Sequence, residues 1–238
     1  MTEGILRFDT LENLLFGEKI NLKNLPGQLV HIYGEAGTGK TTLALQIACG
    51  FCSQGEKVVF IDTEGKVTGS KIQQILKNKD IEQANNLLKL YMPTSFKEQH
   101  ELIQRLEFFL QSQKIGTIII DSITNLYRQE SDLLKEDKRI YKRLTFQVAL
   151  LHKLAKERSF PIILFNQATM VKSEERDFLS NLKQERVNPV AKAIMNYWAD
   201  REIILVSYGF DNFEARIPSE FEGRVKFSID SNGIIPQK

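Results

Sequence analysis

Gly34-Glu35-Ala36-Gly37-Thr38-Gly39-Lys40-Thr41 matches G-x-x-x-x-G-K-[S/T], the pattern of a phosphate-binding loop. The residues on either side make a chance match much less credible. Leu29–Tyr33 is a short, mostly apolar run typical of a buried strand, and residues 42–48 are mainly good helix formers. Strand, glycine loop and helix therefore follow one another in the order that this motif requires.

The chemistry of this loop is specific for phosphate. Glycines let successive backbone N–H groups turn toward one anion, and the positive end of the following helix adds to the same spot. Lys40 is expected to reach the β- and γ-phosphates, and the Thr41 hydroxyl to bind Mg²⁺. The alternative is a glycine-rich turn that binds nothing, and the flanking strand and helix argue against it. The predicted nucleotide-binding residues are Gly34, Glu35, Ala36, Gly37, Thr38, Gly39, Lys40, Thr41 and Thr42.

The composition is that of an ordinary globular chain. Its 238 residues are 42% hydrophobic and 26% charged, with a formal net charge of +2. This length suits one domain over residues 1–238, in which residues 1–26 form a lead-in with leucines at helical spacing. The small net charge means that any contact with DNA needs a local basic patch. No apolar run approaches roughly 18 residues and no secretory signal is visible, so we expect a cytoplasmic protein with no membrane contact.

Cys49 and Cys52 form a C-x-x-C pair. A redox pair or half of a zinc site has this spacing, but the chain holds only 2 cysteines and its histidines lie far away in the sequence. The pair falls near the end of the helix that follows the phosphate loop. We therefore interpret both cysteines as small packing residues and expect no zinc.

Two further apolar runs end in acidic residues. Lys57–Ile61 leads into Asp62-Thr63-Glu64-Gly65, and Gly116–Ile120 leads into Asp121. In a parallel sheet, the carboxyl ends of the strands face the crevice in which ligands bind. Glu64 is therefore a candidate for activating a water near the γ-phosphate, although position alone favours an ordinary acidic turn equally. Asp121 is predicted to hold the Mg²⁺ shell beside the phosphate loop.

The rest of the pattern indicates an α/β domain. Helices are predicted over 70–88, 95–113 and 139–158, strands over 88–92, 160–165 and 202–206, and a hairpin over 213–217 and 225–229. Residues 169–188 have no apolar periodicity and carry balanced charges, which favours a long loop.

With these motifs in place, the chain resembles the RecA/RadA recombinase superfamily, and within it the RadB-like paralogues of archaeal RadA. Asp62–Gly65 and Ile120–Ile123 are similar to the motifs that end two of the family's strands, and Leu126–Arg128 follows as it does there. Phe165–Gln167 resembles the strand that senses the γ-phosphate, and Asn188–Arg201 resembles the stretch that closes the second DNA-binding loop. The resemblance implies a RecA-like P-loop NTPase core, with a mostly parallel central sheet flanked by helices and a C-terminal antiparallel β extension.

The resemblance also implies ATP and Mg²⁺ as cofactors and gives three residues catalytic roles. Glu64 is expected to be the catalytic base, and Lys40 to neutralise charge on the transferred phosphoryl group. Gln167 is expected to couple the state of the nucleotide to the loop over 169–188.

Several features depart from the family's pattern. No helical DNA-binding domain is recognisable, and no Phe-x-x-Ala polymerisation motif precedes Gly34. The loop over 169–188 lacks the glycines expected of the second DNA-binding loop. Lys71 stands nearest to the place of an adenine-stacking arginine, and lysine stacks less well than a planar guanidinium. We therefore expect modest affinity for nucleotide, weakened DNA binding through this loop and no autonomous filament.

The favoured function is an ATP-hydrolysing recombinase paralogue that binds single-stranded DNA and assists homologous recombination and DNA repair at the nucleoid. The alternative is a partner-binding accessory of the main RadA-type recombinase, or of other paralogues, with slow, DNA-independent turnover; a KaiC-like signalling ATPase is a third interpretation. The candidate DNA contacts are basic side chains, each of which has a solvated surface charge as its alternative. They are Lys135, Lys138, Arg139, Lys142, Arg143, Lys172, Arg176, Lys183 and Arg186.

Overall fold

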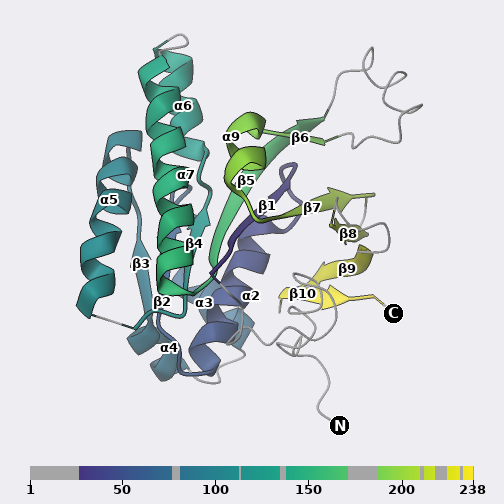
Figure 1. Cartoon of the computed structure of the whole chain (residues 1–238). Helices are drawn as coiled ribbons and strands as arrows, with labels where there is room; N and C mark the ends of the chain where they lie inside the picture. Colours follow the sequence, from purple (N-terminus) through teal and green to yellow (C-terminus); the bar gives the residue numbers. More distant parts are fainter. Residues whose placement is uncertain are drawn as a thin grey trace.

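A twisted, mostly parallel sheet runs through the molecule in the computed structural model, which describes residues 27–76, 81–112, 114–134, 138–170, 187–209, 212–217, 224–230 and 233–237 (Figure 1). The strand order is β10-β9-β8-β7-β1-β5-β4-β2-β3, and β6 pairs with β5 alone. The strands are β1 (Leu29–Gly34), β2 (Val58–Asp62), β3 (Leu88–Tyr91), β4 (Thr117–Asp121), β5 (Ile162–Met170), β6 (Val187–Pro189), β7 (Arg201–Ser207), β8 (Phe213–Arg216), β9 (Arg224–Asp230) and β10 (Gly233–Pro236).

In the order of the sheet, β7, β1, β5, β4, β2 and β3 are parallel to one another. Strands β8, β9 and β10 continue the sheet beyond β7 in antiparallel fashion. Figure 1 shows this antiparallel end at one side of the sheet, away from α5, α6 and α7. The predicted fold class, a mostly parallel central sheet flanked by helices with a C-terminal antiparallel extension, is therefore confirmed. The lead-in over residues 1–26 lies outside the described residues.

Helices cover both faces of the parallel part of the sheet. They are α2 (Lys40–Ser53), α3 (Gly69–Leu76), α4 (Ile81–Leu87), α5 (Phe96–Ser112), α6 (Asn125–Leu133), α7 (Lys138–Arg158) and α9 (Lys192–Trp198). Alternate residues of each strand enter two separate cores. One core packs against α2, α3 and α4, and the other against α5, α6, α7 and α9 (Figure 1). Because β1, β2 and β4 are buried along their whole length, their sequences are nearly continuous apolar runs.

The structure differs from several local predictions. The helix predicted over 70–88 is two short helices, α3 and α4, and Leu88 already belongs to β3, because this stretch pairs in parallel with β2. Helix α6 was not predicted. The ends of the loop predicted over 169–188 are strand, since Ala168–Met170 of β5 pairs with β6. Among the described helices, none is long and apolar enough to cross a membrane.

Gly27 allows helix α7 to approach the start of β1. A Cβ atom at this position would lie 1.7 Å from the carbonyl oxygen of Ala155 in α7, and backbone atoms cannot move aside as a side chain can. We expect Gly27→Ala to lower the free energy of unfolding by about 3 kcal/mol, measured by urea denaturation. Gly69→Ala is the control, because a Cβ there meets nothing within 4 Å, and it should leave stability unchanged or slightly raised. Equal stability of the two variants would contradict this packing.

Candidate active site

The phosphate-loop motif lies between the last residue of β1, Gly34, and the first residue of α2, Lys40. Gly39 and Gly34 show why this loop needs glycine. Gly39 has a φ of +84°, and a Cβ there would lie 2.5 Å from Cδ1 of Ile229. A Cβ on Gly34 would lie 2.4 Å from the carbonyl oxygen of Leu205 in the neighbouring strand. The backbone therefore has the conformation and the close packing for which the motif's glycines were expected.

Lys40 is buried and folded back over the loop. Its Nζ donates to the carbonyl oxygens of Gly34, at 2.9 Å, and Glu35, at 2.6 Å. Burial lowers the pKa of Lys40 to about 8, although the charges of Asp121 and Glu64 oppose this shift. An incoming phosphate would offer anionic oxygens in place of neutral carbonyls, which is a stronger partner for an ammonium group.

Asp121 ends β4 directly beside the loop. Its carboxylate is buried, it accepts a hydrogen bond from the Thr41 side chain, and its Oδ2 atom has no hydrogen-bond partner among the residues that the structure describes. Burial raises the pKa of Asp121 to about 6, against the hydrogen bond from Thr41 and the charge of Lys40. An oxygen atom without a partner next to a threonine hydroxyl fits Mg²⁺, which prefers hard oxygen ligands. Thr41 and Asp121 are thus the residues that would hold the ion.

The raised pKa of Asp121 predicts a cost in stability at neutral pH. In the folded state the Asp121 carboxyl keeps its proton up to a pH of about 6, whereas in the unfolded state it loses the proton near the ordinary pKa of 3.8. The free energy of unfolding therefore falls as the pH rises between these two values. We expect Asp121→Asn to raise the free energy of unfolding by on the order of 2 kcal/mol at pH 7.5 in EDTA, and by little near pH 4. Urea denaturation at the two pH values measures this.

Asp62 provides the contrast for that experiment. Its carboxylate accepts three backbone hydrogen bonds, from Glu64 at 3.0 Å, Gly65 at 2.9 Å and Val67 at 2.8 Å. Asp62→Asn should therefore lower stability, because one side-chain oxygen becomes a donor that faces N–H groups. A gain of stability in both variants would show that the Asp121 effect is not a burial effect.

Glu64 follows β2 in the turn that Asp62 holds. Its Oε1 accepts a hydrogen bond from Nε2 of Gln167 at 2.8 Å, and its Oε2 forms an ion pair with Lys66. Burial raises the pKa of Glu64, but the hydrogen bonds from Lys66 and Gln167 and the charges of Lys66 and Lys40 outweigh burial, so the pKa lies below its ordinary value. The carboxylate is ionised at neutral pH, as a proton acceptor must be.

Two residues of this cluster had no role in the sequence interpretation. Lys66 contacts Glu64 directly, and the guanidinium of Arg128 in α6 donates to Oε1 of Gln167 at 2.7 Å. The only available signals were that Lys66 is two residues beyond Glu64 and that Arg128 lies in the stretch after Asp121. Neither signal reports the direction of a side chain.

Asn166 does not share the environment of Gln167, although the two are neighbours in β5. Its side chain is fully buried, accepts from the Thr124 hydroxyl and donates to the carbonyl oxygen of Val190 at 2.8 Å. Its Nδ2 also lies 3.1 Å from Nε2 of His31, and burial lowers the pKa of this histidine despite the neighbouring Glu202. Asn166 therefore ties β5 to β1 and to the segment after β6.

A hollow of about 140 Å³ adjoins the start of α2. It is lined by Thr41, Thr42, Leu45, Lys71, Gln74, Ile75, Asp230 and Gly233. Helix α3 and the antiparallel strands therefore form its walls. Lys71 lies on one wall, and its Nζ donates to the carbonyl oxygen of Lys66 at 2.9 Å. Lys71, which stands nearest to the place of an adenine-stacking arginine, therefore lies beside the start of α2.

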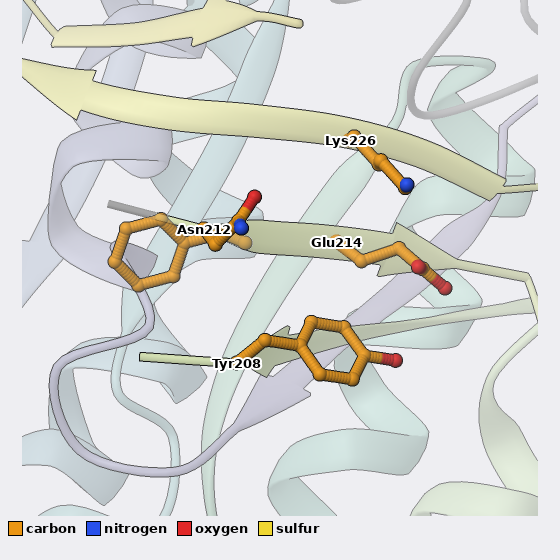
Figure 2. A pocket seen from close by; sticks show the side chains of 5 residues that line it. Tyr208, Asn212, Glu214 and Lys226 are labelled. Carbon is orange, nitrogen blue, oxygen red and sulfur yellow. The ribbon is translucent and has the colours of Figure 1, made fainter. Parts of the chain in front are cut away.

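A second hollow of about 210 Å³ lies among the antiparallel strands and shares no lining residue with the first. Figure 2 shows Tyr208, Glu214 and Lys226 side by side on adjacent segments. Arg216 forms an ion pair with Glu214 and stands 5.7 Å from the centre of the Tyr208 ring. Arg216 engages both Glu214 and Tyr208, and the hollow is open to solvent. We therefore assign no chemical role to this hollow.

The candidate DNA contacts divide into two groups. Lys138, Arg139, Lys142 and Arg143 are exposed on the first turns of α7, and Arg143 lies 3.9 Å from Glu130 of α6. The other five, Lys135, Lys172, Arg176, Lys183 and Arg186, lie outside the described residues.

Cys49 and Cys52 are buried in α2, where burial raises their pKa values to about 12 and about 11. Cys52 packs within the core on the α2 face of the sheet. Both thiols are therefore protonated at neutral pH and act as small apolar side chains, as the sequence interpretation expected.

Comparisons with known proteins agree with this arrangement. A family model described as Rad51 matches residues 10–235. The DNA repair and recombination protein RadB of Methanococcoides burtonii is 30% identical over 212 residues, covering 87% of this chain and 88% of that protein. The protein of the same name from Methanosphaera stadtmanae is 32% identical over 216 residues, covering 88% of each. A solved structure described as the crystal structure of the RadB recombinase superposes with a TM-score of 0.73 at 26% identity, over 99% of this chain and 100% of that one.

Proposed function

Because this chain belongs to the Rad51 family, we propose that it acts in DNA repair and recombination as an ATPase that binds single-stranded DNA. The names of its RadB relatives support the role in repair and recombination. The observation that carries the ATPase proposal is the convergence of four side chains at the carboxyl edge of adjacent parallel strands. Lys40 follows β1, Glu64 follows β2, Asp121 ends β4, and Gln167 lies in β5.

Each of these side chains has one task in the proposed reaction. The loop backbone and Lys40 bind the phosphates, and Lys40 neutralises charge that develops on the transferred phosphoryl group. Thr41 and Asp121 would hold Mg²⁺, which supplies further charge stabilisation when it is bound. Glu64 accepts a proton from the attacking water, and Gln167 orients the Glu64 carboxylate through the hydrogen bond at 2.8 Å.

DNA binding through the first turns of α7 is the finer part of the proposal. Four exposed basic side chains lie within one and a half turns, Lys138, Arg139, Lys142 and Arg143. Such a cluster contacts phosphates rather than bases, so binding should weaken steeply with salt and depend little on sequence. A protein that binds chromosomal DNA in this way works at the nucleoid.

ATP turnover tests the proposal most directly. We would measure phosphate release with Mg²⁺, with and without single-stranded DNA, across a salt series. Turnover that rises with DNA and returns to its basal rate at high salt would support both activities. Protein that neither binds nor hydrolyses Mg-ATP would overturn the ATPase proposal.

A partner-binding accessory with slow turnover is the second candidate, and two observations favour it. Both oxygens of the Glu64 carboxylate are engaged, by Gln167 and by Lys66, which lowers its strength as a base. The contact between the edge strand β3 and α5 is also apolar and partly exposed. Tyr91 of β3 stacks against Phe109 of α5, and Phe109 is 44% exposed. ATP turnover that does not change when DNA is added would favour this candidate.

A further inference from the structure

A continuous polar chain connects α6 to the candidate catalytic base. The Arg128 guanidinium donates to Oε1 of Gln167 at 2.7 Å, and Nε2 of Gln167 donates to Oε1 of Glu64 at 2.8 Å. The three residues come from α6, from β5 and from the turn after β2, and they are 39 and 103 residues apart along the sequence.

The donor and acceptor capacities in this chain permit one orientation of the amide. A guanidinium group only donates hydrogen bonds, and an ionised carboxylate only accepts them. The amide of Gln167 has an oxygen that accepts and a nitrogen that donates. Its oxygen must therefore face Arg128, and its nitrogen must face Glu64. Without Arg128, the amide could turn over and present its oxygen to the carboxylate, and the hydrogen bond to Glu64 would become a repulsion.

Helix α6 holds Arg128 in place for this contact. The side chain of Asn125, at the start of the helix, donates to the carbonyl oxygen of Thr63 at 2.8 Å, and Thr63 immediately precedes Glu64. Leu126 is buried in the core beneath the helix, and the backbone N–H of Arg128 bonds to the carbonyl oxygen of Thr124 at 3.0 Å. The helix and the turn that carries Glu64 therefore form one packed unit.

We propose that Arg128 is a positioning residue that orients the Gln167 amide toward Glu64, and so sets the protonation and direction of the catalytic base. Arg128 acts through Gln167. This role rests on the proposed function, since it takes Glu64 as the base. Lys66, Lys40 and Asp121 are the other charged groups that influence Glu64, and they remain in every variant below.

The test compares Arg128→Met, Gln167→Ala and the double variant with the wild type. We expect Arg128→Met to lower kcat for Mg-ATP about tenfold, with KM nearly unchanged, and to move the acid limb of the kcat profile up by about one pH unit. Because Arg128 acts through Gln167, the double variant should be no slower than Gln167→Ala alone. Arg128→Lys should recover part of the rate, since lysine also donates. Arg105→Met, at an exposed position of α5, is the matched control and should leave the profile unchanged.

A second readout does not depend on turnover. The pKa of the Glu64 carboxyl, followed by carbon NMR of labelled protein, should rise in Arg128→Met by about one unit and should not rise further in the double variant. An unchanged pKa of Glu64 in Arg128→Met would overturn the proposal. So would a double variant whose loss of kcat is the product of the losses in the two single variants. Failure of the proposed function would look different. The wild type would then show no ATP turnover, or a Glu64→Gln variant would be as active as the wild type. The NMR titration decides the positioning role in either case.

Discussion

Glu64→Gln is expected to lower kcat for ATP hydrolysis by about 100-fold or more while leaving the binding of Mg-ATP intact. The amide keeps the shape of the carboxyl group and an oxygen that can accept the hydrogen bond from Gln167, but it cannot take a proton from water. Binding should survive because the phosphates are held by the loop backbone and Lys40. Phosphate release measures the rate, and titration with a fluorescent ATP analogue measures the affinity.

Glu101→Gln is the matched control for this change. Glu101 lies in α5, and its ion pair with Lys97, at 3.9 Å, is exposed on the helix surface. Pairs of this kind contribute little, so the control should keep its turnover. A Glu64→Gln variant that retains more than about half of the wild-type rate would mean that another group activates the water.

The parallel core could be predicted from the sequence because burial on both faces leaves little choice of residue. Leu29–Gly34, Val58–Asp62 and Thr117–Asp121 are fully buried, so each is a mostly apolar run, and two of the three end in an aspartate. The carboxyl ends of parallel strands are also where a sheet binds its ligands, and for this reason Asp121 and the turn after Asp62 were predicted to belong to the site.

The edges of the sheet gave weaker signals. The strand predicted over 88–92 is confirmed as β3, but Leu88–Tyr91 is only 4 residues long and partly exposed, so the helix predicted over 70–88 overlapped it at Leu88. Strand β10 was missed because it holds Gly233 and Pro236, residues that usually end strands. Pairing with β2 and β9, respectively, makes these segments strands, and pairing is a tertiary effect.

The structure brings predicted members of the candidate site together, but the contacts between them could not be predicted from the sequence. Glu64 and Gln167 were named from motifs, yet the contacts of Glu64 with Lys66 and of Gln167 with Arg128 depend on side-chain directions across three elements. Asn166 shows the same limit. Its motif paired it with Gln167, but adjacent residues of a strand point to opposite faces, and Asn166 is buried against His31.

Lys40→Met should weaken the binding of Mg-ATP by about 100-fold and abolish turnover, because the cation proposed to contact the β- and γ-phosphates is replaced by an apolar side chain of similar length. Lys89→Met, at an exposed position of β3, is the control and should bind ATP as the wild type does. Isothermal titration calorimetry measures both affinities.

The lowered pKa of Lys40 makes the same experiment more specific. With a pKa of about 8 in the free protein, Lys40 is partly deprotonated at pH 8, and bound phosphates will raise its pKa. The uptake through Lys40 should therefore be about half a proton at pH 8 and almost none at pH 6.5, since Lys40 is already charged there. Calorimetry in buffers of different ionisation enthalpy measures this uptake, which Lys89→Met should keep and Lys40→Met should lose. Uptake that persists in Lys40→Met would assign the proton to another group, whereas its loss would identify Lys40 as the cation that meets the phosphates.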